Sequence, residues 1–171
     1  MDIFTIRIDR KLVSDVPADT LSLNFFKRER SRQSCMLESG ETIALQLSRG
    51  TRLWGGDLVS TAEGRNVQIL AAKEPVTTVY CESGLQLARL AYHLGNRHVR
   101  VQVGEGWIRY SADHVLDAMV RQLGANPVSE YSSFEPEPGA YHAHEHGASH
   151  GHQDGTGNTV AHTHAHDLSA R

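Results

Sequence analysis

The fold is decided by residues 83–124, which read SGLQLARLAYHLGNRHVRVQVGEGWIRYSADHVLDAMVRQLG. Apolar residues recur there at the spacing i, i+3, i+4, i+7, first over residues 87–94 and again over residues 116–123. This spacing places the apolar side chains on one face of an α-helix. The stretch therefore predicts two amphipathic helices that pack against a common core.

The ends of both helices carry recognisable signals. Ser83 and Asp113 precede the two apolar patterns, and both residue types accept hydrogen bonds as helix N-caps. Gly95 and Gly124 follow the patterns, where a left-handed residue commonly ends a helix. We therefore expect the helices to end at these two glycines.

Strand patterns surround the helices. Valines alternate with polar residues over 99–103, and G-E-G at 104–106 predicts a turn into a second strand, W-I-R-Y at 107–110. The segments 77–80 and 128–131 can supply one strand each. The resulting order is β-α-β-β-α-β, which is that of a ferredoxin-like domain.

The remainder of the chain divides around this domain. Residues 1–74 show short alternating runs between polar turns, which predict an all-β sandwich or barrel. Pro75 restricts the preceding residue and is expected to start the ferredoxin-like domain, residues 75–138. Residues 139–171 have too few apolar side chains to form a core, so we expect them to be disordered. The predicted class is α+β.

The histidines fall into two populations. Three of the eleven lie inside the predicted domain, and the other eight follow residue 139, separated mainly by Ala, Gly, Thr and Glu: His142, His144, His146, His150, His152, His162, His164 and His166. Alternate histidines let a flexible chain place two imidazoles around one ion, and imidazole suits nickel, copper, zinc and iron. The tail is therefore predicted to collect metal; its spaced histidines differ from the uninterrupted run of an expression tag.

Two histidines of the domain occupy suggestive positions. His98 follows the helix-ending Gly95 and is expected to begin a strand, whereas His114 lies in the first turn of the second helix. The partial positive charge at a helix N-terminus favours the neutral imidazole that binds metal. A single histidine in either place is also typical of an ordinary solvated surface.

Composition excludes several classes of protein. The net charge is −3 and no basic, aromatic-rich stripe is present, which argues against a nucleic-acid-binding protein. No apolar run approaches the roughly 18 residues of a membrane span. The N-terminal residues alternate like a strand and lack a signal-peptide core, so a cytoplasmic protein is expected. Cys35 and Cys81 are isolated and are interpreted as idle thiols.

One charged run in the β region has two interpretations. Residues 27–32 read KRERSR, and such a run is most often a solvated loop. Alternatively, the basic side chains of Lys27, Arg28, Arg30 and Arg32 form a docking patch for an acidic partner protein.

Several motifs together resemble the UreE family of urease accessory nickel carriers. They are G-N-R-H at residues 95–98, R-Y-S-A-D-H-V-L-D at 109–117, F-E-P-E at 134–137 and the histidine-rich tail. L-E-S-G-E at 37–41, R-G-T at 49–51 and G-G-D-L at 55–58 also fit the family. The resemblance covers essentially the whole chain.

The resemblance implies a cytoplasmic homodimer that is not an enzyme and that gives Ni(II) to apo-urease together with other accessory proteins, among them a GTPase. It also implies that the N-terminal β domain, residues 1–74, binds peptides or partners, and that the ferredoxin-like domain, residues 75–138, carries metal and forms the dimer. Zn(II) or Cu(II) could bind to the same imidazoles. The family's key histidine corresponds to His98, which would meet its mate from the other subunit. His114 corresponds to a peripheral histidine; some members have a second histidine two residues before it, where this chain has Ala112.

Three other functions compete with this one. A metal-dependent enzyme would need convergent ligands and a general base, but the sequence has no H-E-x-x-H pattern and no facial-triad spacing. A folding helper with a histidine-rich tail would line its pocket with aromatic residues, which are few in the β region. A general metal store differs from a carrier only in whether the ion passes to a partner.

Overall fold

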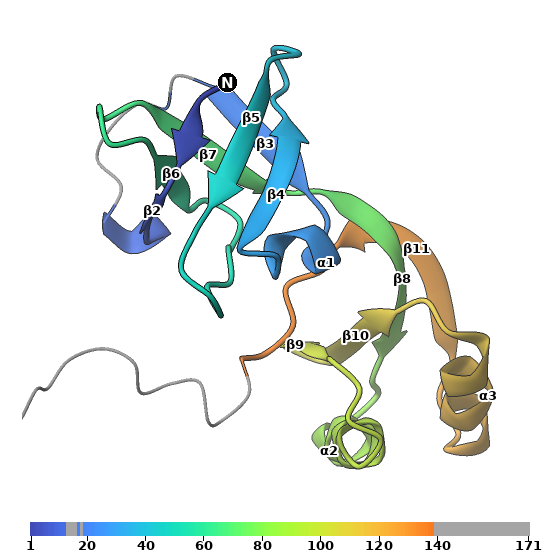
Figure 1. The fold of residues 1–171 in the computed structure, drawn as a ribbon. Coiled ribbons are helices and arrows are strands. Elements are labelled where there is room, and N and C mark those ends of the chain that lie inside the picture. The colour runs from blue at the N-terminus through green and yellow to red at the C-terminus, as the bar shows by residue number, and fades with distance from the viewer. Residues whose placement is uncertain (13–16, 18, 139–171) are drawn as a thin grey trace, which may run out of the picture. The chain divides into compact units, whose positions relative to one another are not determined.

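The computed structural model describes residues 1–12, 17 and 19–138 (Figure 1). Residues 1–137 form one compact unit, Met1–Glu137. The predicted disorder of residues 139–171 and all eight histidines of the tail lie outside the described residues.

The N-terminal part is built from two sheets. The first has the order β1-β5-β4 and contains β1 (Ile3–Phe4), β5 (Thr42–Gln46) and β4 (Arg32–Met36). The second has the order β2-β6-β7-β3 and contains β2 (Ile6–Ile8), β6 (Leu58–Ser60), β7 (Asn66–Ala71) and β3 (Asp19–Leu23). Residues of both sheets share one apolar cluster: Phe4, Leu21, Leu23, Cys35, Leu37, Ile43, Leu45, Leu47, Leu53, Val59, Val67 and Ile69.

The prediction that residues 1–74 contain only strands is wrong in two places. A short 3-10 helix, η1, spans Arg10–Leu12, and an α-helical turn, α1, spans Phe25–Arg28. Asn24 caps α1, because its side-chain oxygen accepts a hydrogen bond from the Lys27 main-chain N–H at 3.0 Å. Helices of three or four residues are too short to show a helical period in the sequence.

The second part has the predicted β-α-β-β-α-β order. It contains β8 (Lys73–Tyr80), α2 (Gly84–Gly95), β9 (Gln102–Gly104), β10 (Trp107–Ser111), α3 (His114–Gln122) and β11 (Pro127–Ser133). Its four strands form an antiparallel sheet of order β11-β8-β10-β9. Leu90 and Leu94 of α2 and Val120 of α3 pack with Val79, Ile108 and Tyr110 of this sheet, so both helices cover the same face.

Two boundaries differ from the prediction. Pro75 lies inside β8, opposite Tyr131 of β11, so the strand begins two residues earlier, at Lys73. The alternation over 99–103 does not produce a strand until Gln102, and Val103 is 40% exposed. The reason is that the main chain up to Val99 closes the end of α2, since the Val99 N–H donates to the Leu94 carbonyl. Within the described residues, no helix is long and apolar enough to cross a membrane.

Candidate metal site

The end of α2 places His98 in a left-handed turn. The main-chain N–H of His98 donates to the Gly95 carbonyl at 2.8 Å, and that of Val99 donates to the Leu94 carbonyl at 3.2 Å. These two hydrogen bonds form a Schellman motif, in which the second-to-last residue adopts the left-handed conformation. His98 is that residue, with φ of 57°. The prediction that Gly95 would take this conformation is wrong, since Gly95 is the last residue of α2.

The conformation of His98 is unusual for a residue with a side chain. Glycine is the ordinary choice at this position, and the left-handed region costs other residues about 1 kcal/mol. Among the described residues, His98 alone has a positive φ without being glycine. Backbone strain of this kind concentrates at functional sites. The turn holds an exposed imidazole at a fixed point of the fold, four residues before β9 begins at Gln102.

The second predicted histidine, His114, lies on a well-ordered helix start. It is the first residue of α3, its side chain is exposed, and Asp113 caps the helix by accepting from Val115 N at 2.8 Å and Leu116 N at 3.2 Å. The predicted caps Asp113 and Ser83 are thus confirmed.

Other residues of the motif around His114 have structural partners. The Tyr110 hydroxyl donates to the Asp117 carboxylate at 2.8 Å. The pKa of Tyr110 is raised far above its ordinary value, mainly by burial and secondly by this hydrogen bond. Arg109 donates to Thr78, to Glu130 and to the Ser133 carbonyl. These contacts join β10 to β8, β11 and α3, and the only imidazole of the motif stays exposed.

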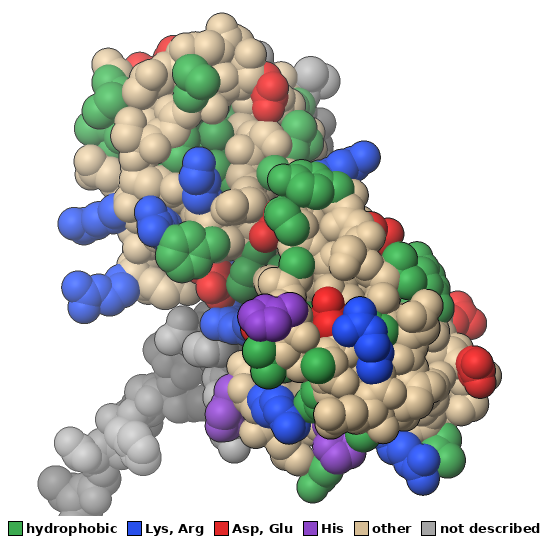
Figure 2. Space-filling view, turned by 90° about the vertical axis from the view of Figure 1, so that its right-hand side faces the viewer, with side chains coloured by type: hydrophobic (Ala, Val, Ile, Leu, Met, Phe, Trp, Pro, Cys, Tyr) green, Lys and Arg blue, Asp and Glu red, His purple; other side chains and the backbone are tan. Residues whose placement is uncertain are grey.

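The structure does not bring the domain histidines together. Figure 2 shows histidine side chains as separate patches, and no group of three or more His, Cys, Asp or Glu among the described residues could hold a metal ion. His93, the third histidine of the domain, is half-buried, and its ring stands edge-on to Tyr92 with 5.3 Å between centroids. Within residues 1–12, 17 and 19–138, His98 is therefore not part of a ready-made metal-binding group.

Among the described residues, neither cysteine belongs to a group of side chains that could hold a metal ion. Cys35 is buried in the N-terminal core, and burial raises the pKa of its thiol; burial also raises the pKa of the Cys81 thiol.

The F-E-P-E segment is anchored next to the His98 turn. Phe134 is fully buried and packs with Phe25 and Val76. The Glu135 main-chain N–H donates to the side chain of Gln102 at 3.0 Å, and the Glu137 main-chain N–H donates to the Val101 carbonyl at 2.8 Å. The chain therefore leaves the compact unit from a point tied to residues that follow His98.

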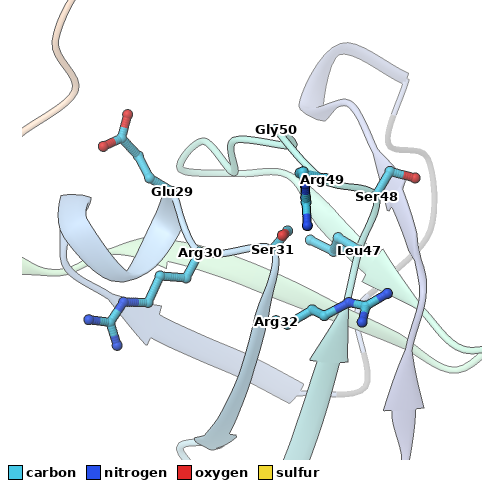
Figure 3. A pocket seen from close by; sticks show the side chains of 8 residues that line it. All are labelled: Glu29, Arg30, Ser31, Arg32, Leu47, Ser48, Arg49 and Gly50. Carbon is cyan, nitrogen blue, oxygen red and sulfur yellow. The ribbon is translucent and has the colours of Figure 1, made fainter.

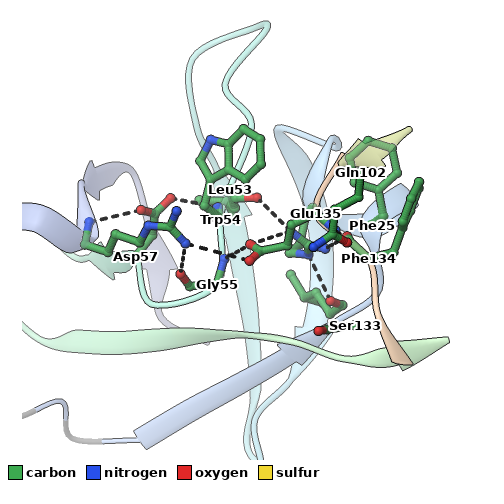
Figure 4. Close-up of polar contacts among 12 residues, drawn as sticks. Phe25, Leu53, Trp54, Gly55, Asp57, Gln102, Ser133, Phe134 and Glu135 are labelled. Carbon is green, nitrogen blue, oxygen red and sulfur yellow. Dashed lines mark hydrogen bonds and ion pairs between the residues drawn. The ribbon is translucent and has the colours of Figure 1, made fainter. Parts of the chain in front are cut away.

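The basic run divides into one buried and three exposed side chains. Arg28 is fully buried and donates to the carbonyls of Leu23, Leu53 and Phe134 at 3.2, 3.4 and 2.5 Å (Figure 4). Its NH1 also lies 3.4 Å from a Glu135 carboxylate oxygen. Burial lowers the pKa of its guanidinium. The prediction that Arg28 contacts a partner is therefore wrong, whereas Lys27, Arg30 and Arg32 are exposed.

The same network gives the G-G-D-L motif a structural role (Figure 4). The Gly55 main-chain N–H donates to Glu135 at 2.7 Å, and a Cβ at position 55 would lie 3.2 Å from that carboxylate oxygen. Asp57 is fully buried and accepts from Arg7 at 2.6 Å and from the Trp54 main-chain N–H at 2.8 Å. These contacts hold the loop before β6 against the F-E-P-E segment.

Sequence reasoning missed one link to the His98 turn. Arg100 lies 3.2 Å from the Glu29 carboxylate, which also accepts from Arg52 at 2.7 Å. The two ends of the Arg100–Glu29 ion pair are far apart in the chain, so no local pattern could have shown it.

Comparison with known proteins agrees with the motifs. Residues 5–72 match the family described as UreE urease accessory protein, N-terminal domain, and residues 74–166 match its C-terminal domain. Three similar proteins are each named urease accessory protein UreE. That of Alkalilimnicola ehrlichii is 47% identical over 80% of this chain and 84% of its own length. That of Alcanivorax borkumensis is 52% identical over 71% of this chain and 72% of its own length. That of Proteus mirabilis is 49% identical over 75% of this chain and 80% of its own length.

Proposed function

The chain belongs to the UreE family of urease accessory proteins, and from that premise we propose that it carries Ni(II) to apo-urease. Nickel is the cargo, so the protein must hold the ion and also release it. The observation that carries the proposal is His98, an exposed imidazole fixed in a left-handed turn. The direct test is whether the nickel-loaded protein activates apo-urease.

A carrier site should be open, and one chain offers an open site. A structural metal centre closes its coordination shell with four protein ligands, which slows release. Within the described residues, no such cluster surrounds His98. Two copies related by a two-fold axis would bring two His98 rings to one ion and leave further positions free. The ion would then be bound but accessible to a receiving protein.

The first prediction is that the chain is a homodimer. The reason is that His98 supplies one imidazole per chain, so a fixed site requires a second copy. Light scattering of the metal-free protein at micromolar concentration should give twice the monomer mass of 18.9 kDa. A mass of one chain, both without and with nickel, would exclude the two-fold site.

We propose that histidines of the tail complete the site. Glu137 is bound to Val101, three residues after His98, so the Cα atoms of Val101 and His98 lie within about 11 Å. His142 follows Glu137 by five residues, which span up to about 17 Å when extended. The first tail histidine is therefore tethered within reach of the turn, and a short tether gives a high effective concentration.

The second prediction concerns removal of residues 139–171. The shortened protein should bind fewer nickel ions but keep its fold and its tightest site, because the described residues up to 138 already contain a buried core and residues 139–171 have few apolar side chains. Calorimetric titration and thermal unfolding of both forms measure this. Loss of all nickel binding would show that the tail, and not His98, creates the principal site.

The remaining assignments follow from the family. We propose that the receiving proteins are apo-urease and an accessory GTPase, and that the chain acts in the cytoplasm. His114 is proposed as a weaker peripheral ligand. The tail histidines are proposed to accept Zn(II) or Cu(II) as well as nickel, since imidazole binds all three. A metal store is the second candidate, favoured by the eight tail histidines, and it predicts binding without transfer.

A further inference from the structure

The side chain of Arg100 ties the end of the His98 turn to the helical turn α1. The Arg100 guanidinium lies 3.2 Å from the Glu29 carboxylate and 5.8 Å from the centroid of the Phe25 ring. Phe25 is the first residue of α1 and Glu29 is its C-cap, so the two side chains are four residues apart and lie on the same side of the helical turn. One short helix therefore provides both of these contacts.

The Glu29 carboxylate serves two arginines. Figure 3 shows its side chain leaving the end of α1 and pointing away from the other labelled side chains, which line a pocket of about 530 Å³. Arg52 donates to this carboxylate at 2.7 Å, and its side chain is only 15% exposed. Arg100 lies farther away, at 3.2 Å, and its side chain is 49% exposed. The Arg100–Glu29 pair is therefore the weaker of the two and separates more easily.

The main chain between the His98 turn and β9 has little support of its own. The Val99 N–H still bonds back to α2, and the Val101 carbonyl accepts from the Glu137 N–H at 2.8 Å. Arg100 lies between these two points, and its main chain makes no hydrogen bond to another described residue. Its side-chain contacts with α1 therefore fix Arg100, two positions after His98.

Loss of these contacts would change the conformation of the turn itself. The left-handed conformation of His98 is unfavourable for a residue with a side chain, so it persists only while the residues on both sides hold it. Helix α2 holds the preceding side, and Arg100 contributes to the following side. With Arg100 released, His98 would visit other conformations, and its imidazole would leave a bound ion more often.

We propose that Glu29 is a positioning residue for the nickel site: its ion pair with Arg100 holds the His98 turn in the conformation that retains nickel, and opening of the pair speeds nickel release. The inference rests on the proposed function, since it takes His98 as a nickel ligand. The pair is partly exposed, and such pairs change an equilibrium by at most about fivefold. The N-terminal part thus adjusts nickel release without supplying a ligand.

The test measures nickel release from the full-length protein loaded with half an equivalent of nickel per chain, so that the tightest site fills first. A chromogenic chelator in excess takes up the released ion, and its absorbance gives the dissociation rate. Glu29→Gln and Arg100→Gln should each speed release about three- to fivefold. The double variant Glu29→Gln/Arg100→Gln should speed release by the same factor and not by the product, because both changes break one contact.

Two controls separate positioning from other effects. The two single variants change the local charge in opposite directions, so a purely electrostatic effect on the cation would speed release in one and slow it in the other. Arg52→Gln removes the other partner of Glu29 and leaves the Arg100 contact in place, so it should change the rate less than about twofold. The visible absorption bands of bound nickel should match those of the wild type in all of these variants, because no ligand is lost.

His98→Asn separates this inference from the function on which it rests. If His98→Asn releases nickel as slowly as the wild type, His98 is not the fixed ligand, and the proposed site and the positioning role both fail. If His98→Asn releases nickel faster while Glu29→Gln and Arg100→Gln match the wild type, or change the rate in opposite directions, only the positioning role is overturned. A rate in Arg52→Gln equal to that in Arg100→Gln would overturn it as well.

Discussion

His98→Ala is expected to abolish most nickel-dependent activation of apo-urease at limiting nickel, while His114→Ala causes a small loss. In a homodimer, one substitution at position 98 removes both fixed imidazoles from the shared site. The tail histidines remain but have no fixed point on which to converge. His114 is exposed on α3 and has Ala112 in place of a second histidine, so we expect it to bind nickel weakly alone.

The role of His98 as a ligand can be separated from its role in the turn. Asparagine also tolerates the left-handed region, so His98→Asn should keep the Schellman turn and lose only the imidazole. His98→Gly should raise thermal stability slightly, because glycine adopts φ near 57° without strain. Both variants should fold as well as the wild type and still fail to activate urease.

The measurement is urease activity in a reconstituted system with the other accessory proteins. Replacement of any single tail histidine serves as a matched control and should have little effect, since seven others remain. If His98→Asn activates like the wild type while His114→Ala does not, the functional site lies on α3 and not at the end of α2.

Arg28→Ala is expected to destabilise the protein by about 3–5 kcal/mol, because it breaks a buried, hydrogen-bonded charge network. The guanidinium has no exposed surface, and its loss leaves three main-chain carbonyls without this donor. Glu135 would lose one of its cationic partners. Since Arg28 also holds the Phe134 carbonyl, the F-E-P-E segment should loosen first.

Urea denaturation of Arg28→Ala, Arg28→Lys and Arg30→Ala measures the effect. The stability of Arg28→Lys should lie between those of Arg28→Ala and the wild type, since an ammonium group cannot reproduce the planar set of guanidinium donors. Arg30→Ala is the matched control two residues away and should lie within about 0.5 kcal/mol of the wild type, because its side chain is exposed. If Arg28→Ala lowers the free energy of unfolding by less than about 1 kcal/mol, water molecules replace the hydrogen bonds of Arg28 and the prediction is wrong.

The sequence predicted the second part of the fold well because its elements carry local signals. The apolar spacing of α2 and α3 and the caps Ser83 and Asp113 are properties of single segments, and the structure confirms them. The boundary at Gln102 was missed because residues 99–103 alternate like a strand, whereas the main chain of residues 97–99 closes the end of α2. The hydrogen bond from the Val99 N–H to the Leu94 carbonyl keeps Val99 out of the strand.

The site was predictable in part for the same reason. His98 and His114 stand in recognisable motifs and lie where an exposed imidazole is expected. That His98 itself takes the left-handed position could not be foreseen while Gly95 was available nearby. The burial of Arg28 depends on Glu135 and Phe134, more than a hundred positions away. In the sequence, Arg28 is indistinguishable from its exposed neighbours.

The most direct measurement of the central claim is nickel transfer to apo-urease in the presence of a chelator. The nickel-loaded protein, apo-urease and the accessory proteins are mixed with enough chelator to prevent activation by an equal amount of free nickel. Direct delivery predicts that urease still becomes active, in proportion to the loaded protein, and that His98→Asn removes this activity. If activation disappears with the free nickel, the protein stores the ion and does not hand it over, and the carrier function is contradicted.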